Sequence, residues 1–304
     1  MAPRRIELIE VAARDGLQNE PEVLSTEVKV ALIGRAVAAG IRRLEAASFV
    51  NPKRVPQMAD AEAVMAALPA RDDVTYIGLV LNRRGFDRAA AAGCREVNYA
   101  LVASDAFSER NQGTTIDQAI AVFEDIARAA QEAGIRISLT LSAAFGCPFQ
   151  GEVRPERVHE LVRQCAGMGA FEIGIADTIG VAVPTQVSEM FAEVARIAPG
   201  VILRGHFHNT RNTGLANAVA ALDAGAHALD ASIGGIGGCP FAPAATGNIA
   251  TEDLVYMLNR MGIETGIDIE ALIETAHWIE GQLGRAVPAM VSRAGNFPPA
   301  ELRA

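Results

Sequence analysis

Two histidines separated by one residue form the most specific candidate site in this sequence. His206 ends the apolar segment 201–206, which has the pattern of a β-strand, and His208 follows two positions later. Side chains at positions i and i+2 of a strand point to the same side, so both imidazoles can reach one cation. Such a pair also occurs in protein cores or by chance on surfaces. Its position at a strand end favours a metal site.

Carboxylates and an arginine lie near the ends of other expected strands. Arg14 and Asp15 follow the first strand and offer a cation and a hard oxygen ligand, although such a pair alone is typical of a surface ion pair. Glu45 lies in an otherwise apolar segment, where a lone carboxylate is costly to bury and needs a partner such as Arg14. Asp177 places another carboxylate at the end of the sixth strand.

A glycine-rich run carries a third group of candidates. Four glycines within residues 234–238 precede Cys239, so we expect a mobile loop that permits close backbone approach and brings the thiol into a site on closing. An ordinary glycine-rich turn with an inert cysteine is the alternative. Asn248, further along, is either a neutral oxygen ligand or a helix-capping residue.

The elements that must position these residues alternate along the chain. Eight short apolar segments are predicted to be strands: 6–11, 43–46, 74–81, 96–102, 136–141, 171–176, 201–206 and 228–231. Helices are predicted over 26–39, 86–92, 116–133, 155–168, 185–197, 213–224, 251–261 and 269–283. Repeated strand–helix units imply a parallel sheet, and eight of them at this length fit an α/β fold of the (β/α)8 TIM-barrel type.

A doubly wound open sheet is the structural alternative, but no Gly-x-Gly-x-x-Gly follows the first strand. We expect the extra C-terminal helix, 269–283, to pack on the outside of the barrel or to cover one end. No linker is visible, so residues 1–304 are expected to form a single TIM-barrel catalytic domain. In such a barrel, active-site groups lie at the C-terminal ends of the strands, where all the candidate residues would converge.

Composition narrows the classes of function. The 304 residues are 50% hydrophobic and carry a net charge of −9, which argues against a broad nucleic-acid-binding face. No segment approaches the ~20 apolar residues of a membrane span, and the N-terminus has no export signal. The four cysteines lack metal-type spacing and do not form a disulfide framework. We therefore expect neither nucleic-acid nor membrane partners, and a cytoplasmic location.

The ordered motifs resemble those of the 3-hydroxy-3-methylglutaryl-CoA (HMG-CoA) lyase family, in the metal-dependent lyase/synthase TIM-barrel superfamily, over residues 6–284. The matching runs are Arg14-Asp-Gly-Leu-Gln-Asn-Glu20, Ser48-Phe-Val-Asn-Pro-Lys53, Val55-Pro-Gln-Met58, Gly146-Cys-Pro-Phe149, Asp177-Thr-Ile-Gly180, Gly237-Gly-Cys-Pro240 and Gly247-Asn-Ile-Ala-Thr-Glu-Asp253.

This resemblance implies a set of roles. The implied metal ligands are Asp15, His206, His208 and Asn248. Mixed oxygen and nitrogen ligands with open positions suit a divalent cation such as Mg²⁺ or Mn²⁺ better than a closed zinc site. The implied catalytic residues are Arg14, Glu45, Asp177, His206 and Cys239. The residues expected to contact the coenzyme A (CoA) part of an acyl-CoA substrate are Ser48, Lys53, Arg54 and Asn111.

The implied reaction is cleavage of the C2–C3 bond of a 3-hydroxyacyl-CoA, most simply HMG-CoA to acetyl-CoA and acetoacetate, as in leucine degradation. The metal would lower the pKa of the C3 hydroxyl, and Arg14 would stabilise the developing enolate. Asp177 or His206 is the expected base, and Cys239 or a neighbouring acid would protonate the departing carbanion. Base and acid are not assigned separately.

One segment departs from the family pattern. The second histidine is usually followed by Asp-Thr-Tyr-Gly-Gln-Ala, whereas here it is followed by Asn209-Thr-Arg-Asn-Thr-Gly214. Lyases for citramalyl-CoA, methylmalyl-CoA or a longer-branched 3-hydroxyacyl-CoA are therefore alternatives. A Claisen-type synthase that condenses acetyl-CoA with a 2-oxo acid and a non-catalytic barrel are more distant ones. The resemblance also implies a homodimer or larger homo-oligomer.

Overall fold

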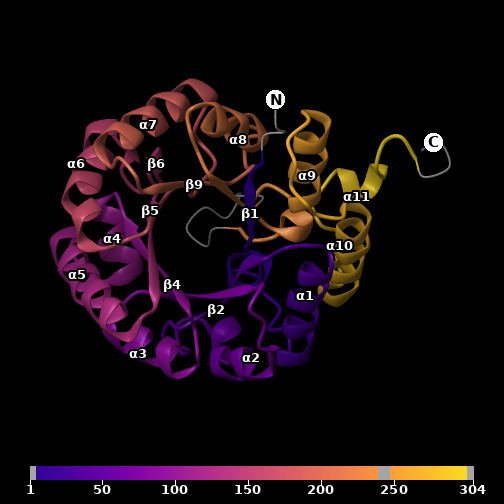
Figure 1. Ribbon diagram of the computed structural model, residues 1–304, viewed down its shortest axis with the longest axis horizontal. Helices are drawn as coiled ribbons and strands as arrows, with labels where there is room; N and C mark the ends of the chain where they lie inside the picture. The colour runs from indigo at the N-terminus through magenta and orange to yellow at the C-terminus, as the bar shows by residue number, and fades with distance from the viewer. Residues whose placement is uncertain (1–4, 239–246, 300–304) are drawn as a thin grey trace.

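The computed structural model describes residues 5–238 and 247–299. Eight parallel strands close into a barrel in the order β1-β10-β9-β8-β5-β4-β3-β2, inside a ring of helices (Figure 1). The strands are β1 (Glu7–Glu10), β2 (Arg43–Ser48), β3 (Thr75–Val80), β4 (Glu96–Val102), β5 (Arg136–Ser142), β8 (Glu172–Asp177), β9 (Ile202–Phe207) and β10 (Ala228–Ala231). The predicted TIM barrel is confirmed, and the open-sheet alternative is wrong.

The helices follow the predicted pattern with a few additions. They are α1 (Thr26–Ala38), α2 (Ala61–Ala67), α3 (Arg83–Ala91), α4 (Asp105–Gln112), α5 (Ile116–Ala133), α6 (Pro155–Cys165), α7 (Pro184–Ile197), α8 (Gly214–Asp223), α9 (Thr251–Arg260), α10 (Ile269–Leu283) and α11 (Val291–Ala294). The short helices α2, α4 and α11 and the hairpin of β6 (Gly146–Cys147) and β7 (Gly151–Glu152) were not predicted. These elements are too short for a periodic apolar pattern to stand out.

Helix α5 shows how local sequence sets these boundaries. Thr115 and Gln118 form a reciprocal capping box at its start, and Gly134 adopts a left-handed conformation at its end. Between them, residues such as Phe123 and Ile126 recur at helical spacing and are fully buried against the barrel. These signals set the start of the helix just after α4 and its end just before β5.

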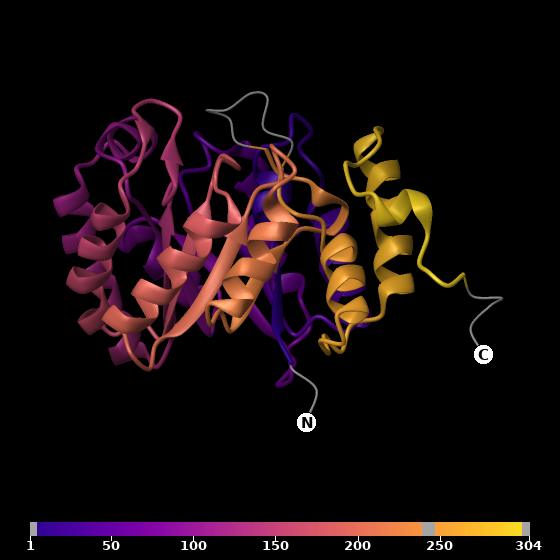
Figure 2. The same cartoon turned by 90° about the horizontal axis from the view of Figure 1, so that it is seen from above.

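The C-terminal helix α10 lies outside the ring. It packs against α1 and α9, and α11 follows beside it (Figures 1 and 2). Of the two predicted placements, packing on the outside is therefore correct. In the described ranges, no helix combines the length and apolar character needed to cross a membrane.

The N-terminal end of the barrel is filled by a charged network instead of the usual branched apolar side chains. Arg43 donates to Glu96 Oε1 from Nε at 2.9 Å and to Glu172 Oε1 from Nη2 at 2.9 Å. All three side chains are at most 4% exposed. Removing one partner of such a buried pair typically costs about 3–5 kcal/mol, because the other charge is left without compensation. This network fills the barrel interior at that end.

Two buried carboxylates anchor the glycine-rich segment at the C-terminal end. Glu10 Oε1 accepts the N–H groups of Ala12 at 2.8 Å and Ile233 at 3.0 Å, and Oε2 accepts the hydroxyl of Thr251 at 2.7 Å. The Glu252 carboxylate accepts the N–H of Gly234 at 3.1 Å. Residues 233–238 are buried or half-buried, and these bonds hold Ile233 and Gly234. The expected mobility of the loop stays a prediction.

Burial raises the pKa of Glu10 to about 7, and it raises the pKa of Glu252 to about 8. Desolvation favours the protonated carboxyl in both cases, against hydrogen bonds that favour the ionised form. A group whose pKa is higher in the folded chain contributes stability at low pH and loses it as pH rises through the folded value.

We predict that Glu10→Gln weakens the pH dependence of stability. The parent chain should lose unfolding free energy relative to the variant, on the order of 3 kcal/mol between about pH 4.5 and about pH 8, since each pKa unit corresponds to about 1.4 kcal/mol. Urea unfolding across this range measures the difference. Glu156→Gln, on the exposed face of α6, is the matched control and should follow the parent. Parallel curves for the parent and Glu10→Gln would contradict the prediction.

Candidate active site and metal centre

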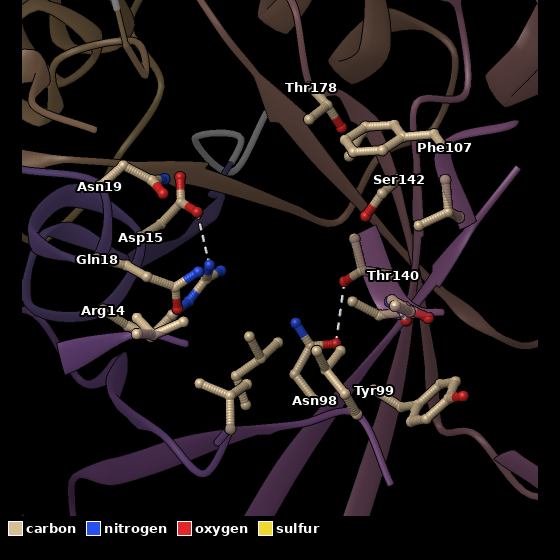
Figure 3. Close-up of a pocket in the computed structure, with 18 of the residues that line it drawn as sticks. Arg14, Asp15, Gln18, Asn19, Asn98, Tyr99, Phe107, Thr140, Ser142 and Thr178 are labelled. Atoms are coloured by element: carbon tan, nitrogen blue, oxygen red, sulfur yellow. Dashed lines mark hydrogen bonds and ion pairs between the residues drawn. The ribbon is translucent and has the colours of Figure 1, made fainter. Parts of the chain in front are cut away.

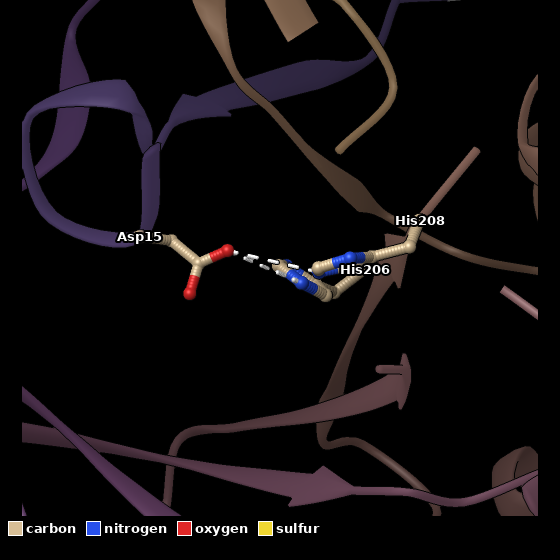
Figure 4. Close-up of side chains that lie close together, drawn as sticks. All are labelled: Asp15, His206 and His208. Carbon is tan, nitrogen blue, oxygen red and sulfur yellow. Dashed lines mark ion pairs between the residues drawn. The ribbon is translucent and has the colours of Figure 1, made fainter. Parts of the chain in front are cut away.

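Asp15, His206 and His208 meet at the C-terminal mouth of the barrel (Figure 4). Asp15 comes from a tight helical turn, η1 (Ala12–Gly16), directly after β1, while His206 lies in β9 and His208 just beyond it. Asp15 Oδ2 is 3.7 Å from His208 Nε2 and 4.0 Å from His206 Nε2. The two imidazole rings lie 5.2 Å apart between centroids. The predicted i, i+2 geometry therefore brings both rings to one carboxylate.

The charges around Asp15 suit a cation ligand. Burial alone would raise the pKa of Asp15, but the Arg14 guanidinium and the two imidazoles hold it well below the usual value. Asp15 is thus ionised at neutral pH. One ligand atom from each of Asp15, His206 and His208 lies within 4.8 Å of the others, the arrangement that a single bound ion requires. Two imidazole nitrogens and a carboxylate oxygen fit a divalent metal.

Asn248 lies beside this group, because its backbone forms an isolated β-bridge with His208. Its Nδ2 donates to Asp15 Oδ2 at 2.8 Å and to the carbonyl of Ile236 at 3.1 Å. Helix α9 begins after Ala250 and has no side-chain cap, so the capping alternative for Asn248 is wrong. A half-turn of the amide about Cβ–Cγ would aim Oδ1 at the same point, which makes Asn248 a suitable fourth ligand.

The glycine-rich segment lies directly against these side chains. Gly237 has a φ of 105°, which side chains rarely tolerate, and a Cβ there would come within 2.8 Å of both Asn248 Nδ2 and the Asp15 carbonyl oxygen. Only glycine allows this contact. The predicted close backbone approach is found, and it occurs beside the proposed metal ligands.

Arg14 is part of the buried interior. Its Nε donates to Glu45 Oε2 at 2.5 Å, its Nη1 donates to Asp15 Oδ1 at 2.5 Å, and its Nη2 forms a further ion pair with Glu45. Arg14 is 8% exposed and Glu45 is fully buried, so the surface-pair alternative is wrong and the predicted partner of Glu45 is correct. Three of the five guanidinium N–H groups are used, which leaves two for a ligand.

Asp177 has a different setting. At the end of β8, its two oxygens accept the N–H groups of Val181 and Ala182, each at 2.9 Å. Burial raises its pKa despite these bonds. The carboxylate is turned into the loop that leads to α7, and it does not line the cavity described next.

A cavity of about 1030 Å³ opens beside Arg14, Asp15 and the two histidines. Its opposite wall is polar, with Asn98, Thr140, Ser142 and Thr178 facing Arg14 and Gln18 across the space (Figure 3). Asn98 Nδ2 donates to Glu45 Oε1 at 2.7 Å, and Thr140 Oγ1 donates to Asn98 Oδ1 at 3.0 Å. The wall is thus connected by hydrogen bonds to the Arg14 side of the site.

These wall residues were missed in the sequence. Asn98 and Thr140 stand inside the apolar strands β4 and β5, which is the same signal that singled out Glu45. Asp230, in β10, is a further buried carboxylate of this kind, and its Oδ2 lies 3.1 Å from His206 Nδ1. Polar residues within apolar strands were therefore the usable signal for the barrel interior.

The residues expected to contact CoA are not all at the cavity. Arg54 lines it, whereas Lys53 is exposed nearby and does not. Ser48 is fully buried at the end of β2. Asn111 lies in α4, and its side chain is outside the described part of the structure. Cys239 also lies outside the described residues, so its role stays a prediction.

Comparisons with known proteins agree over nearly the whole chain. The family model described as HMGL-like matches residues 5–279. The (R)-citramalyl-CoA lyase of Chloroflexus aurantiacus is 45% identical, covering 97% of this chain and 96% of that protein. The hydroxymethylglutaryl-CoA lyase of Pseudomonas mevalonii is also 45% identical, covering 92% and 93% respectively. A solved HMG-CoA lyase from Acinetobacter baumannii, in complex with coenzyme A and 3-methylmalate, is 39% identical with a TM-score of 0.93, covering 97% of this chain and 96% of that one.

We predict that His208→Ala abolishes tight binding of Mn²⁺. Loss of a direct ligand should weaken affinity by more than the roughly 10- to 100-fold typical of an outer-shell change. Equilibrium dialysis with Mn²⁺ measures this directly. His159→Ala, on α6 in the outer ring, is the matched control and should bind as the parent does. Unchanged affinity in His208→Ala would remove this histidine from the ligand set.

Proposed function

The chain belongs to the HMGL-like family, and from that premise we propose that it is a divalent-metal-dependent carbon–carbon lyase that cleaves the C2–C3 bond of a 3-hydroxyacyl-CoA. The observation that carries this proposal is the group formed by Asp15, His206 and His208, with Asn248 beside it, at the mouth of a large cavity. The favoured reaction converts HMG-CoA to acetyl-CoA and acetoacetate.

The ligand set proposed for Mg²⁺ or Mn²⁺ is Asp15, His206, His208 and Asn248. A divalent cation held there supplies Lewis-acid polarisation of the substrate oxygens. The ionised carboxylate of Asp15 is the ligand form such a cation needs.

The residues of the chain account for the remaining steps. A base takes the proton of the C3 hydroxyl, the C2–C3 bond breaks, and its electron pair moves to the thioester carbonyl as an enolate. Arg14 presents its two remaining N–H groups to the cavity and stabilises the developing negative charge on the enolate oxygen. Glu45 holds Arg14 in place from below. A proton delivered to C2 then completes acetyl-CoA.

We propose Asp177 or His206 as the base, and Cys239 or a neighbouring acid as the proton donor at C2. His206 lines the cavity and Asp177 does not, so His206 lies closer to a bound substrate. It can act as the base only when it is not bound to the metal, because a neutral imidazole has one lone pair. Asp177 instead shapes the β8–α7 loop through its two backbone bonds. Cys239→Ser with its folding intact should lower turnover by orders of magnitude, and unchanged turnover would remove Cys239 from the mechanism.

Citramalyl-CoA is the second candidate substrate. A citramalyl-CoA lyase and an HMG-CoA lyase share the same identity with this chain, 45%. The divergent segment that follows His208 does not decide between them, because none of residues 209–214 lines the cavity. Arg211 donates to the carbonyls of Ile179 at 3.1 Å and Gly180 at 2.9 Å, and so it holds the neighbouring loop. The acyl group is therefore selected by the cavity wall.

The proposal also covers the domain organisation, the oligomeric state, the location and the CoA contacts of the protein. We propose a single catalytic domain over residues 1–304 that acts as a homodimer or larger homo-oligomer in the cytoplasm, in leucine degradation where HMG-CoA is the substrate. Within the described ranges Cys94, Cys147 and Cys165 are free and buried, which supports a reducing compartment. Lys53, Arg54, Ser48 and Asn111 remain the proposed contacts to CoA.

A substrate panel tests the activity. Purified protein with Mn²⁺ and a thiol reductant would be given HMG-CoA, citramalyl-CoA, methylmalyl-CoA and a longer-branched homologue. Release of the acyl-CoA product, acetyl-CoA or (from methylmalyl-CoA) propionyl-CoA, would be followed. We expect rapid metal-dependent cleavage of HMG-CoA. Cleavage of citramalyl-CoA alone would keep the mechanism and change the substrate. If nothing is cleaved, release of free CoA from acetyl-CoA and a 2-oxo acid would identify a synthase and overturn the lyase.

We predict that Arg14→Lys lowers kcat by about 100-fold or more, the usual cost of losing a positioned donor to a developing oxyanion. A lysine has the charge but not the planar fork that reaches Glu45, Asp15 and the substrate together. Steady-state kinetics on the cleaved substrate measure the change. Arg128→Lys, on the exposed side of α5, should leave kcat unchanged. A parental kcat in Arg14→Lys would contradict the role.

A further inference from the structure

Asp230 is a buried carboxylate that the proposed reaction does not use. It lies in β10, is 3% exposed, and stands opposite His206 in the register between β10 and β9. A carboxylate in the barrel interior is costly unless charged or hydrogen-bonding partners compensate for its lost hydration. The groups that contact Asp230 therefore indicate how the cost of its burial is compensated.

The first partner is a proposed metal ligand. Asp230 Oδ2 lies 3.1 Å from His206 Nδ1, and His206 is itself only 7% exposed. A carboxylate can only accept at this distance, so the neutral imidazole must carry its proton on Nδ1. The lone pair is then on Nε2, the atom that faces Asp15.

The second partner fixes the carboxylate from the other side. Arg204 is fully buried two residues before His206 on the same strand, and its Nη1 lies 3.6 Å from Asp230 Oδ1. Arg204 is held in turn, because its Nη2 donates to Thr140 Oγ1 at 2.7 Å and its Nε lies 3.3 Å from Glu172 Oε1. The Asp230 carboxylate thus lies between the His206 imidazole, which it contacts at hydrogen-bond distance, and the Arg204 guanidinium, with which it forms an ion pair beyond that distance.

The two histidines of the site differ in this respect. His208 Nδ1 is buried and has no hydrogen-bond partner within the described residues. His206 has a charged partner on Nδ1, and His208 has none. Of these two histidines, only His206 therefore has a partner that can set its proton position and ring orientation.

We propose that Asp230 is a positioning residue that fixes the Nδ1–H tautomer of His206 and aims its Nε2 at the metal centre, with Arg204 fixing Asp230. Carboxylates that accept from the second nitrogen of a ligating histidine orient the ring and increase its basicity as a ligand. The metal-binding part of this inference rests on the proposed function. The tautomer is a property of the metal-free chain and does not.

The variant Asp230→Asn tests this arrangement, because the Arg204 guanidinium determines the orientation of the amide group that replaces the carboxylate. A guanidinium only donates, so the Asn oxygen should turn to Arg204 and the NH2 group to His206 Nδ1. His206 must then accept at Nδ1 and carry its proton on Nε2, where it blocks the lone pair needed for the metal. We expect Mn²⁺ affinity to fall by about 10- to 100-fold.

Two measurements would be made. Long-range ¹H–¹⁵N NMR of the metal-free chain, recorded over a pH series that reaches the neutral form of the His206 imidazole, reports the tautomer, with His206 signals identified by their loss in His206→Gln. Electron paramagnetic resonance of free Mn²⁺ reports affinity. Asp125→Asn, an exposed change of the same charge on α5, is the matched control and should alter neither readout.

The expected result is an Nδ1–H tautomer in the parent, an Nε2–H tautomer in Asp230→Asn, and weaker Mn²⁺ binding in that variant. Saturating Mn²⁺ should restore much of kcat, which a general loss of structure would not allow.

An Nε2–H tautomer in the parent, or unchanged Mn²⁺ affinity in a folded Asp230→Asn, would overturn the inference. If the variant does not fold, the tautomer of the parent decides. An Nδ1–H tautomer in a parent that binds no Mn²⁺ would overturn the proposed metal centre and leave the positioning of His206 intact.

Discussion

The buried guanidinium of Arg14 is the interaction on which the site depends. It lies between Glu45 and Asp15, and both carboxylates would be costly to bury without it. Burial would raise the pKa of Glu45, but Arg14 and Arg204 hold it below its usual value, so the carboxylate stays ionised beneath the site. One cation thus stabilises a structural carboxylate on one side and a proposed metal ligand on the other. Arg14 also lines the cavity.

Buried charged groups, in this case carboxylates, also hold the loops at the C-terminal mouth of the barrel. Glu10 and Glu252 accept backbone N–H groups from the glycine-rich segment, and Asp177 accepts two from the β8–α7 loop. Each buried carboxylate replaces lost hydration with donors from the loop it must fix. The loops therefore have defined positions although they lack regular secondary structure, and Gly237 can lie against Asn248 and Asp15.

The sequence was sufficient for the barrel and for the residues that project from strand ends. Apolar periodicity, glycine stops and the spacing of His206 and His208 depend on local geometry, which a pattern can express. The partners of Glu10, Asp230 and Arg204 could not be predicted, because they depend on strand register and on which side chains meet inside a closed barrel. Helix α4 was missed because its eight residues show no apolar stripe.

Two sides of the cavity have separate tasks. The side with Arg14, Asp15 and the histidines carries charge and ligand atoms, which suit bond cleavage next to a thioester whatever the acyl group is. The wall with Asn98, Thr140 and Ser142 offers neutral hydrogen-bonding groups next to apolar side chains such as Phe107, a combination that suits recognition of an acyl substituent. Because a site built to form hydrogen bonds rejects a ligand that leaves them unpaired, this wall can change the substrate while the chemistry is kept. Relatives with different named substrates and the same identity to this chain are consistent with that separation.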